Sequence, residues 1–217
     1  MMVRKKTWEF AHCAAVHTAK KEWKHLPIYN FTVPAKRIFE SNILLIICCA
    51  FYLAWWLLAF KPNGAVKGMK TGWLLIPAFA AGLAAIIFAV RGITSSQAKA
   101  ALFPNWSLLL GDIALYIILL FITRLLFKRP VTTELFLIVG WAALALSEID
   151  TLYGIGVFSH ILAVIFVAVV AAGTLMNFIC YMLYYNLGKR AGYFDGMIPL
   201  IGVALITLSI SIAMLSA

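Results

Sequence analysis

The sequence predicts an all-α integral membrane protein, built as a bundle of about six transmembrane helices with a basic amphipathic N-terminal arm. Hydrophobic residues make up 64% of the 217 residues, charged residues make up only 12%, and the mean hydropathy is +0.98. Soluble domains carry about 25% charged residues, so the bilayer is the expected solvent of this chain. The apolar runs are continuous and do not alternate with polar residues, which argues against a transmembrane β-barrel.

The order of apolar and polar stretches predicts one membrane domain over residues 42–217, preceded by an arm and linker over residues 1–41. Most of the apolar runs are close to the length of about 20 residues that a helix needs to cross the hydrocarbon core. The predicted spans are residues 42–60, 71–90, 106–127, 132–149, 155–187 and 196–217.

The fifth predicted span, residues 155–187, is too long for one straight crossing. As a helix it would extend about 50 Å, against a hydrocarbon core of about 30 Å. We therefore expect a strong tilt, a kink near Gly173 and Thr174, or an exit from the membrane near Asn177.

Basic residues lie in the N-terminal arm and at the ends of the apolar runs. In the arm they alternate with apolar residues at roughly helical spacing, which predicts a helix on the membrane surface; the alternative is a disordered basic tail. The net charge of +10 would suggest nucleic acid in a soluble protein. Here we expect anionic lipid headgroups as partners, and no nucleic acid. The basic tail before the first span favours a cytoplasmic N-terminus, although the loops on the two sides carry similar numbers of Lys and Arg.

No cofactor and no metal are predicted. The four cysteines show no Cys-x-x-Cys spacing and are expected to be small core residues. A membrane haem held by paired histidines is not expected, because His160 has no histidine partner in another span. The chain also lacks a nucleotide-binding loop, a zinc-protease motif and a serine-hydrolase elbow.

Asp112 is the first candidate functional residue, because a charged residue in a span costs about 3 kcal/mol on insertion scales and is usually functional. It is predicted about two turns inside the third span, and Tyr116 shares its helix face and can donate a hydrogen bond to it. A buried Asp112 would suit a proton carrier or a general acid or base. The alternative places Asp112 at the level of the lipid headgroups.

The string from Leu109 to Asp112, Leu-Leu-Gly-Asp, locally resembles the Gly-Asp segment of the lysoplasmalogenase-like membrane hydrolases. That family has more helices and a histidine that follows closely, and neither feature is matched in this chain. No family is therefore assigned from the sequence.

The second candidate is formed by Glu148, Asp150 and His160, with His160 predicted about one and a half turns inside the fifth span. Carboxylates and an imidazole this close in sequence could hold a divalent metal or relay protons. A metal site needs three or four converging ligands, however, and side chains two positions apart on a helix do not share a face. We therefore expect a solvated acidic loop followed by a histidine with its hydrogen bonds satisfied.

These features predict a non-enzymatic membrane protein that transports or binds a small solute, or that serves as an integral subunit of a larger complex. Small residues in the spans favour assembly with a second copy or with partner subunits. The alternative is an intramembrane enzyme acting on a lipid, with Asp112 or Glu148 as general acid or base and His160 assisting. Convergence of Asp112 and His160 on a lipid-accessible cavity would favour the enzyme, and a polar path between the two faces would favour the transporter.

Overall fold

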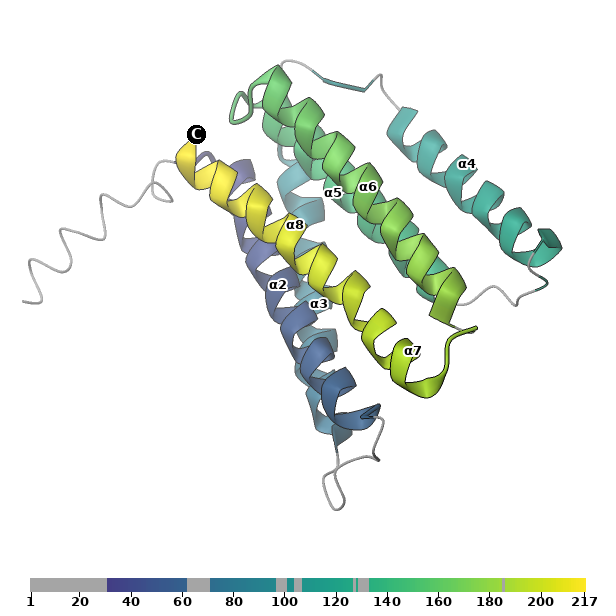
Figure 1. Cartoon of the computed structure of the whole chain (residues 1–217). Coiled ribbons are helices and arrows are strands. Elements are labelled where there is room, and N and C mark those ends of the chain that lie inside the picture. Colours follow the sequence, from purple (N-terminus) through teal and green to yellow (C-terminus); the bar gives the residue numbers. More distant parts are fainter. Residues whose placement is uncertain are drawn as a thin grey trace, which may run out of the picture.

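The computed structural model describes residues 31–61, 71–96, 101–103, 107–126, 128, 133–184 and 186–217. The predicted N-terminal arm lies almost entirely outside these residues. Within them all regular elements are helical (Figure 1). Six helical segments of this described part are long and apolar enough to cross a membrane, which indicates a multi-pass membrane protein.

The helices follow the predicted spans, with shifted ends. A 3-10 turn, η3, precedes α3, a π-helical turn, η4, continues α4, and the short α7 leads directly into α8. Their bounds are α2 Val33–Ala59, η3 Thr71–Leu74, α3 Leu75–Thr94, α4 Ser107–Phe121, η4 Ile122–Leu126, α5 Thr133–Gly154, α6 His160–Tyr184, α7 Lys189–Asp195 and α8 Met197–Ser216.

Helix α2 begins at Val33, whereas the sequence predicted that the first span begins at residue 42. A proline, Pro34, stands in the first turn of this helix. Proline is well tolerated there, because the first N–H groups of a helix have no partner within the helix. The stretch read as a linker from the arm is therefore helical from Val33 onward.

The prediction of an overlong fifth helix is wrong, because residues 155–159 form a turn in which Gly156 has a φ of +80°. Glycine adopts this left-handed conformation without steric cost. Helix α6 then runs without interruption from His160 to Tyr184, through Gly173 and Asn177. Its 25 residues extend about 37 Å, so the helix can cross the hydrocarbon core of about 30 Å with its ends in the headgroup regions.

Five helices pack in a closed order, and we call this arrangement the ring. In it α2 packs on α3, α3 on α5, α5 on α6, α6 on α8, and α8 on α2, whereas α4 lies outside and packs mainly on α5 (Figure 1). Successive spans run in opposite directions. The start of α2, the end of α5, the start of α6 and the end of α8 therefore lie together at one end of the ring, which we call the His160 end. The opposite end is called the Tyr184 end.

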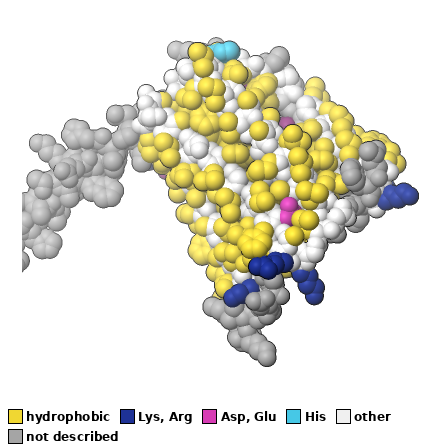
Figure 2. Space-filling view, in the orientation of Figure 1, with side chains coloured by type: hydrophobic (Ala, Val, Ile, Leu, Met, Phe, Trp, Pro, Cys, Tyr) yellow, Lys and Arg dark blue, Asp and Glu magenta, His cyan; other side chains and the backbone are white. Residues whose placement is uncertain are grey.

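Small residues allow α2 and α3 to approach each other closely. Ala78, Ala85 and Ala89 of α3 are buried, and a Cβ added to Gly82 would lie 3.1 Å from the Sγ atom of Cys48. The outer faces are covered with apolar side chains, as Figure 2 shows for one side of the molecule. Such a surface fits a hydrocarbon solvent.

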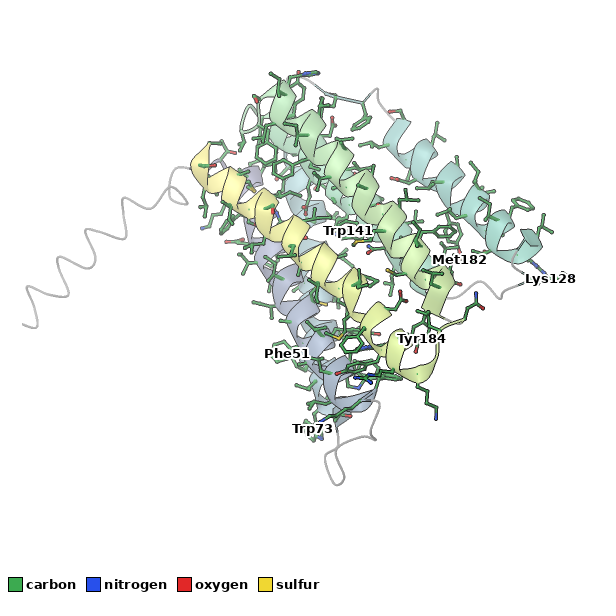
Figure 3. The ribbon with its side chains drawn as sticks, in the orientation of Figure 1. Phe51, Trp73, Lys128, Trp141, Met182 and Tyr184 are labelled. Atoms are coloured by element: carbon green, nitrogen blue, oxygen red, sulfur yellow. The ribbon has the colours of Figure 1, made fainter. Side chains whose placement is uncertain are left out.

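Aromatic side chains join α2 to α7 at the Tyr184 end, near the labelled Tyr184 in Figure 3. The indole Nε1 of Trp56 donates a hydrogen bond to the backbone oxygen of Tyr193, 3.0 Å away, and the indole stacks on Phe60 with ring centroids 4.3 Å apart. The Tyr193 hydroxyl donates to the backbone oxygen of Leu57 at 3.3 Å. Amphipathic aromatic residues are enriched at membrane interfaces, which is where these residues are expected to lie.

Candidate functional site at the junction of three helices

Glu148 is the most deeply buried acidic side chain of the described residues, with 3% of its surface exposed. Its Oε1 atom lies 3.1 Å from the hydroxyl oxygen of Ser41, and that hydroxyl lies 2.9 Å from the backbone oxygen of Ala85. These three residues belong to α5, α2 and α3, respectively. A carboxyl group, a hydroxyl group and a carbonyl group from three ring helices therefore meet inside the ring.

The expected solvated acidic loop is wrong at Glu148, because α5 continues through this stretch to Gly154. Ala145 and Leu152, one turn before and one turn after Glu148, are buried in the apolar core of the ring. Side chains three or four positions apart share a helix face, so Glu148 is turned to the inside of the ring together with them. Packing of this apolar face extends the helix beyond the predicted end at residue 149.

Glu148 has no cationic partner within 4.0 Å among the described residues. Arg37 lies one turn before Ser41 on α2, but its guanidinium Nη1 donates to the backbone oxygen of Arg91, 3.1 Å away. An unpaired ionised carboxylate inside a span is costly, and such acids usually mark an ion, proton or substrate site. Glu148 therefore has the environment of a functional acid.

Asp150 does not join Glu148, and it lies on a different face of α5 as its spacing predicted. One oxygen of its carboxyl group, Oδ1, accepts hydrogen bonds from the backbone N–H groups of Leu102 and Phe103, at 2.6 and 3.4 Å. These contacts fasten the segment before α4 to the end of α5. Asp150 thus has a structural role in the described part of the chain.

Replacing Asp150 with alanine is expected to loosen this segment and to lower the free energy of unfolding by about 1–3 kcal/mol, because two backbone N–H groups lose a charged acceptor. Hydrogen–deuterium exchange of the peptide that contains Leu102 and Phe103 measures the effect. The Asp150→Asn variant keeps an acceptor oxygen and should exchange more slowly than Asp150→Ala. Equal exchange of wild type and Asp150→Ala would contradict the anchoring role.

Asp112 and Tyr116 lie on α4, outside the ring. Asp112 is half-buried, and the Tyr116 ring packs edge-on against Phe136 with centroids 6.3 Å apart. The structure gives no hydrogen bond between Asp112 and Tyr116, although both are described. The polar centre predicted around Asp112 therefore lies apart from Glu148.

His160 is the first residue of α6 and is exposed, so its predicted place inside a span is wrong. Its imidazole packs edge-on against Tyr153 with ring centroids 5.8 Å apart. Asp112 and His160 thus belong to different parts of the bundle, with no contact recorded between them in the described regions. The convergence expected of an enzyme site is not observed, and no group of three or more metal-ligating side chains occurs within the described residues.

No protein-family model, no curated protein and no solved structure matches this chain. The polar residues inside the ring are therefore the main indication of its function.

Several buried polar residues of the ring were not recognised from the sequence. On α6, Asn177 and Thr174 share a buried face with Gly173 and Cys180, and this helical spacing is the signal that could have identified them. Thr207 and Ser211 are buried on α8 in the same way. Near the Tyr184 end, Asp195, the last residue of α7, is also buried.

Their positions in the helices place these residues at different depths of the bundle. At 1.5 Å per helical residue, Glu148 lies about 9 Å from the end of α5, and Asn177 lies about 25 Å from the start of α6. Asp195 lies at the opposite end, just before α8. We call this series the polar column, and its members are Ser41, Asn42, Glu148, Thr174, Asn177, Thr207, Ser211 and Asp195.

Three members of the polar column carry a buried atom without a hydrogen-bond partner: Asn42 at Nδ2, Asn177 at Oδ1 and Asp195 at Oδ2. The indole Nε1 of Trp141, on the α5 face that packs near Gly173, is also without a partner. Buried polar groups in native proteins are nearly always hydrogen-bonded to protein or to water. Unpaired groups at several depths of one bundle therefore need an explanation beyond packing.

Proposed function

We propose that this protein transports a small polar solute through the ring, with Glu148 as the central residue of the pathway. The observation that carries the proposal is the buried Glu148 at the junction of α2, α3 and α5, which is hydrogen-bonded to Ser41 but has no cationic partner among the described residues. An apolar residue would pack at this position without the cost of burying an acid. An acid at this buried position is useful if its charge binds a transported solute or ion.

The polar column supports transport, because its members extend from near the His160 end to the Tyr184 end. Each buried donor or acceptor that is left unpaired costs about 1–3 kcal/mol. Water or a polar solute within the ring would supply the missing partners of Asn42, Asn177 and Asp195. These unpaired polar groups would be unfavourable in a sealed bundle, but in a pathway they can bind water or the solute.

The alternative, an intramembrane enzyme acting on a lipid, receives less support. In that hypothesis Asp112 or Glu148 acts as general acid or base with His160 assisting, and such groups must lie within reach of the same reacting atoms. The side chain bonded to Glu148 is the hydroxyl of Ser41, whereas Asp112 is on α4 and His160 is at the exposed start of α6. A subunit role without transport is the remaining possibility and is an outcome of the test below.

Accessibility of the polar column to water-soluble reagents tests the proposal. The four native cysteines are replaced by serine, and single cysteines are introduced as Asn177→Cys, inside the ring, and Leu175→Cys, on the exposed face of the same helix. A charged, membrane-impermeant methanethiosulfonate is then added to sealed vesicles of either orientation. We expect the Asn177→Cys variant to be labelled and the Leu175→Cys variant to stay unlabelled, because a charged reagent does not enter the lipid.

Labelling of Asn177→Cys from both sides of the membrane supports a transport pathway. Labelling from one side alone contradicts transport and fits a binding or enzyme site with a single opening. If Asn177→Cys resists labelling from both sides, the ring is a sealed core and the subunit role remains.

A further inference from the structure

We propose that Glu148 and Ser41 form a proton-binding site, so that solute transport is coupled to the movement of protons. This inference rests on the proposed transport function and adds the identity of the coupling ion. It starts from the hydrogen-bond geometry of one carboxyl group, one hydroxyl group and one carbonyl group.

The Ser41 hydroxyl has a single hydrogen but lies within hydrogen-bonding distance of two acceptor oxygens. These are the Oε1 atom of Glu148 at 3.1 Å and the backbone oxygen of Ala85 at 2.9 Å. One hydrogen cannot make a full bond to both oxygens. A proton on Glu148 supplies the missing second hydrogen. The carboxylic acid then donates to the Ser41 hydroxyl, and this hydroxyl donates to the backbone oxygen of Ala85.

The same residues also accommodate the form without the proton. When Glu148 releases its proton, the Ser41 hydroxyl can rotate and donate to the carboxylate, which is a stronger, charge-assisted bond. The carbonyl of Ala85 lies within α3, where it remains part of the helix backbone. Uptake and release of one proton thus change the direction of the hydrogen bonds at this site.

The charged groups around Glu148 leave it free to exchange its proton. On α2, Arg37 donates to the backbone of Arg91, while Lys36 and Glu40 pair with each other at 4.0 Å. On α5, Asp150 accepts hydrogen bonds from Leu102 and Phe103. Farther around the ring, α6 begins with His160, which packs on Tyr153. The other titratable side chains of α6 lie toward the Tyr184 end and are Cys180, Tyr181 and Tyr184. Helix α8 has no titratable side chain. A fixed cation beside the carboxylate would hold it permanently ionised, and none lies within salt-bridge distance in the described structure.

Proton binding also explains how the site could drive a conformational change. The reaction is the combination of the Glu148 carboxylate with one proton to give the neutral acid, without any change in oxidation state. It removes a buried charge at the junction of α2, α3 and α5, so the neutral and ionised forms stabilise different arrangements of these helices. A proton gradient can then bias the side to which the ring opens.

Dicyclohexylcarbodiimide tests the site directly, because this apolar reagent modifies protonated carboxyl groups that it reaches through the membrane. The purified full-length protein is reconstituted in liposomes and treated across a pH series, and the adducts are located by peptide mass spectrometry. We expect an adduct on Glu148 whose yield decreases as the pH rises. We expect no corresponding adduct on Glu40, which lies on α2, is more exposed than Glu148 and pairs with Lys36. The Glu148→Gln variant should lack the adduct.

Two results would overturn the proposal. Absence of an adduct on Glu148 at every pH would show that the site does not take up a proton. Protection of Glu148 by added sodium ions at constant pH would identify sodium as the bound cation instead.

The role of Ser41 is tested with the Ser41→Ala variant in the same assay. Loss of the charge-assisted hydrogen bond to the carboxylate should move the pH of half-maximal labelling upward by about one unit. An unchanged value would show that Ser41 only packs between the helices. The assay needs no solute, so labelling of Glu148 in a protein whose Asn177→Cys variant is inaccessible keeps the proton site and rejects transport.

Discussion

The Glu148→Gln variant is expected to fold normally and to lose the ability to open to both sides of the membrane. Glutamine is neutral and close in size to glutamic acid, and its amide can both donate to and accept from the Ser41 hydroxyl. The hydrogen bond seen at 3.1 Å therefore has a counterpart in the variant, and the cost of burying a charge is removed. The midpoint of thermal unfolding should stay the same or rise slightly.

The functional loss is measured in the Asn177→Cys background with the same impermeant thiol reagent. Because glutamine cannot release a proton, the ring stays in the arrangement that the neutral residue favours. Labelling from one side should then fall by at least about tenfold, which corresponds to a population shift of about 1.4 kcal/mol. Glu40→Gln serves as the control, because Glu40 on α2 is more exposed than Glu148 and pairs with Lys36. This variant should be labelled as the parent is.

Two outcomes would contradict this view of Glu148. Unchanged labelling from both sides would show that its titration does not control access. A large loss of thermal stability in Glu148→Gln would show that the acid is needed for folding, which the proposed exchange of hydrogen-bond direction does not predict.

The Gly196→Ala variant is expected to be the most destabilising of the single-methyl changes considered, because a Cβ at this position overlaps the indole of Trp56. The added carbon would lie 2.8 Å from the Cε2 atom of that ring. The indole cannot turn aside cheaply, since it stacks on Phe60 and donates to the backbone oxygen of Tyr193. Overpacking and the lost hydrogen bond together predict a loss of about 2–4 kcal/mol in the free energy of unfolding.

Thermal unfolding in mild detergent, followed by intrinsic tryptophan fluorescence, measures this loss. Gly188→Ala is the matched control, because it is the glycine just before α7 and no other atom lies within 4 Å of its added Cβ. We expect a clear decrease in melting temperature for Gly196→Ala and little change for Gly188→Ala. Equal melting temperatures would mean that α2 and α7 are not held together as the Trp56 contacts indicate.

For Glu148, the sequence predicted a candidate functional acid but not its burial inside the ring. The sequence marks it as one of the few acids near an apolar run, but the predicted span ends at residue 149, so a solvated acidic loop was expected there. Hydropathy averages over a window and does not register that Ala145 and Leu152 place this part of α5 against the ring core. For His160 the error was opposite, because a glycine turn at Gly156 delays the start of α6 and leaves the imidazole at its exposed end.

Composition and the lengths of the apolar runs predicted the six helices that are long and apolar enough to cross a membrane. A membrane span must satisfy its own backbone hydrogen bonds and match the thickness of the bilayer, so composition and length are sufficient to predict it. Which polar groups meet inside the ring becomes evident only from the packing of the helices. Ser41 and Glu148 are 107 positions apart, and their contact depends on how α2, α3 and α5 pack, which is set by interlocking side chains of helices distant in sequence.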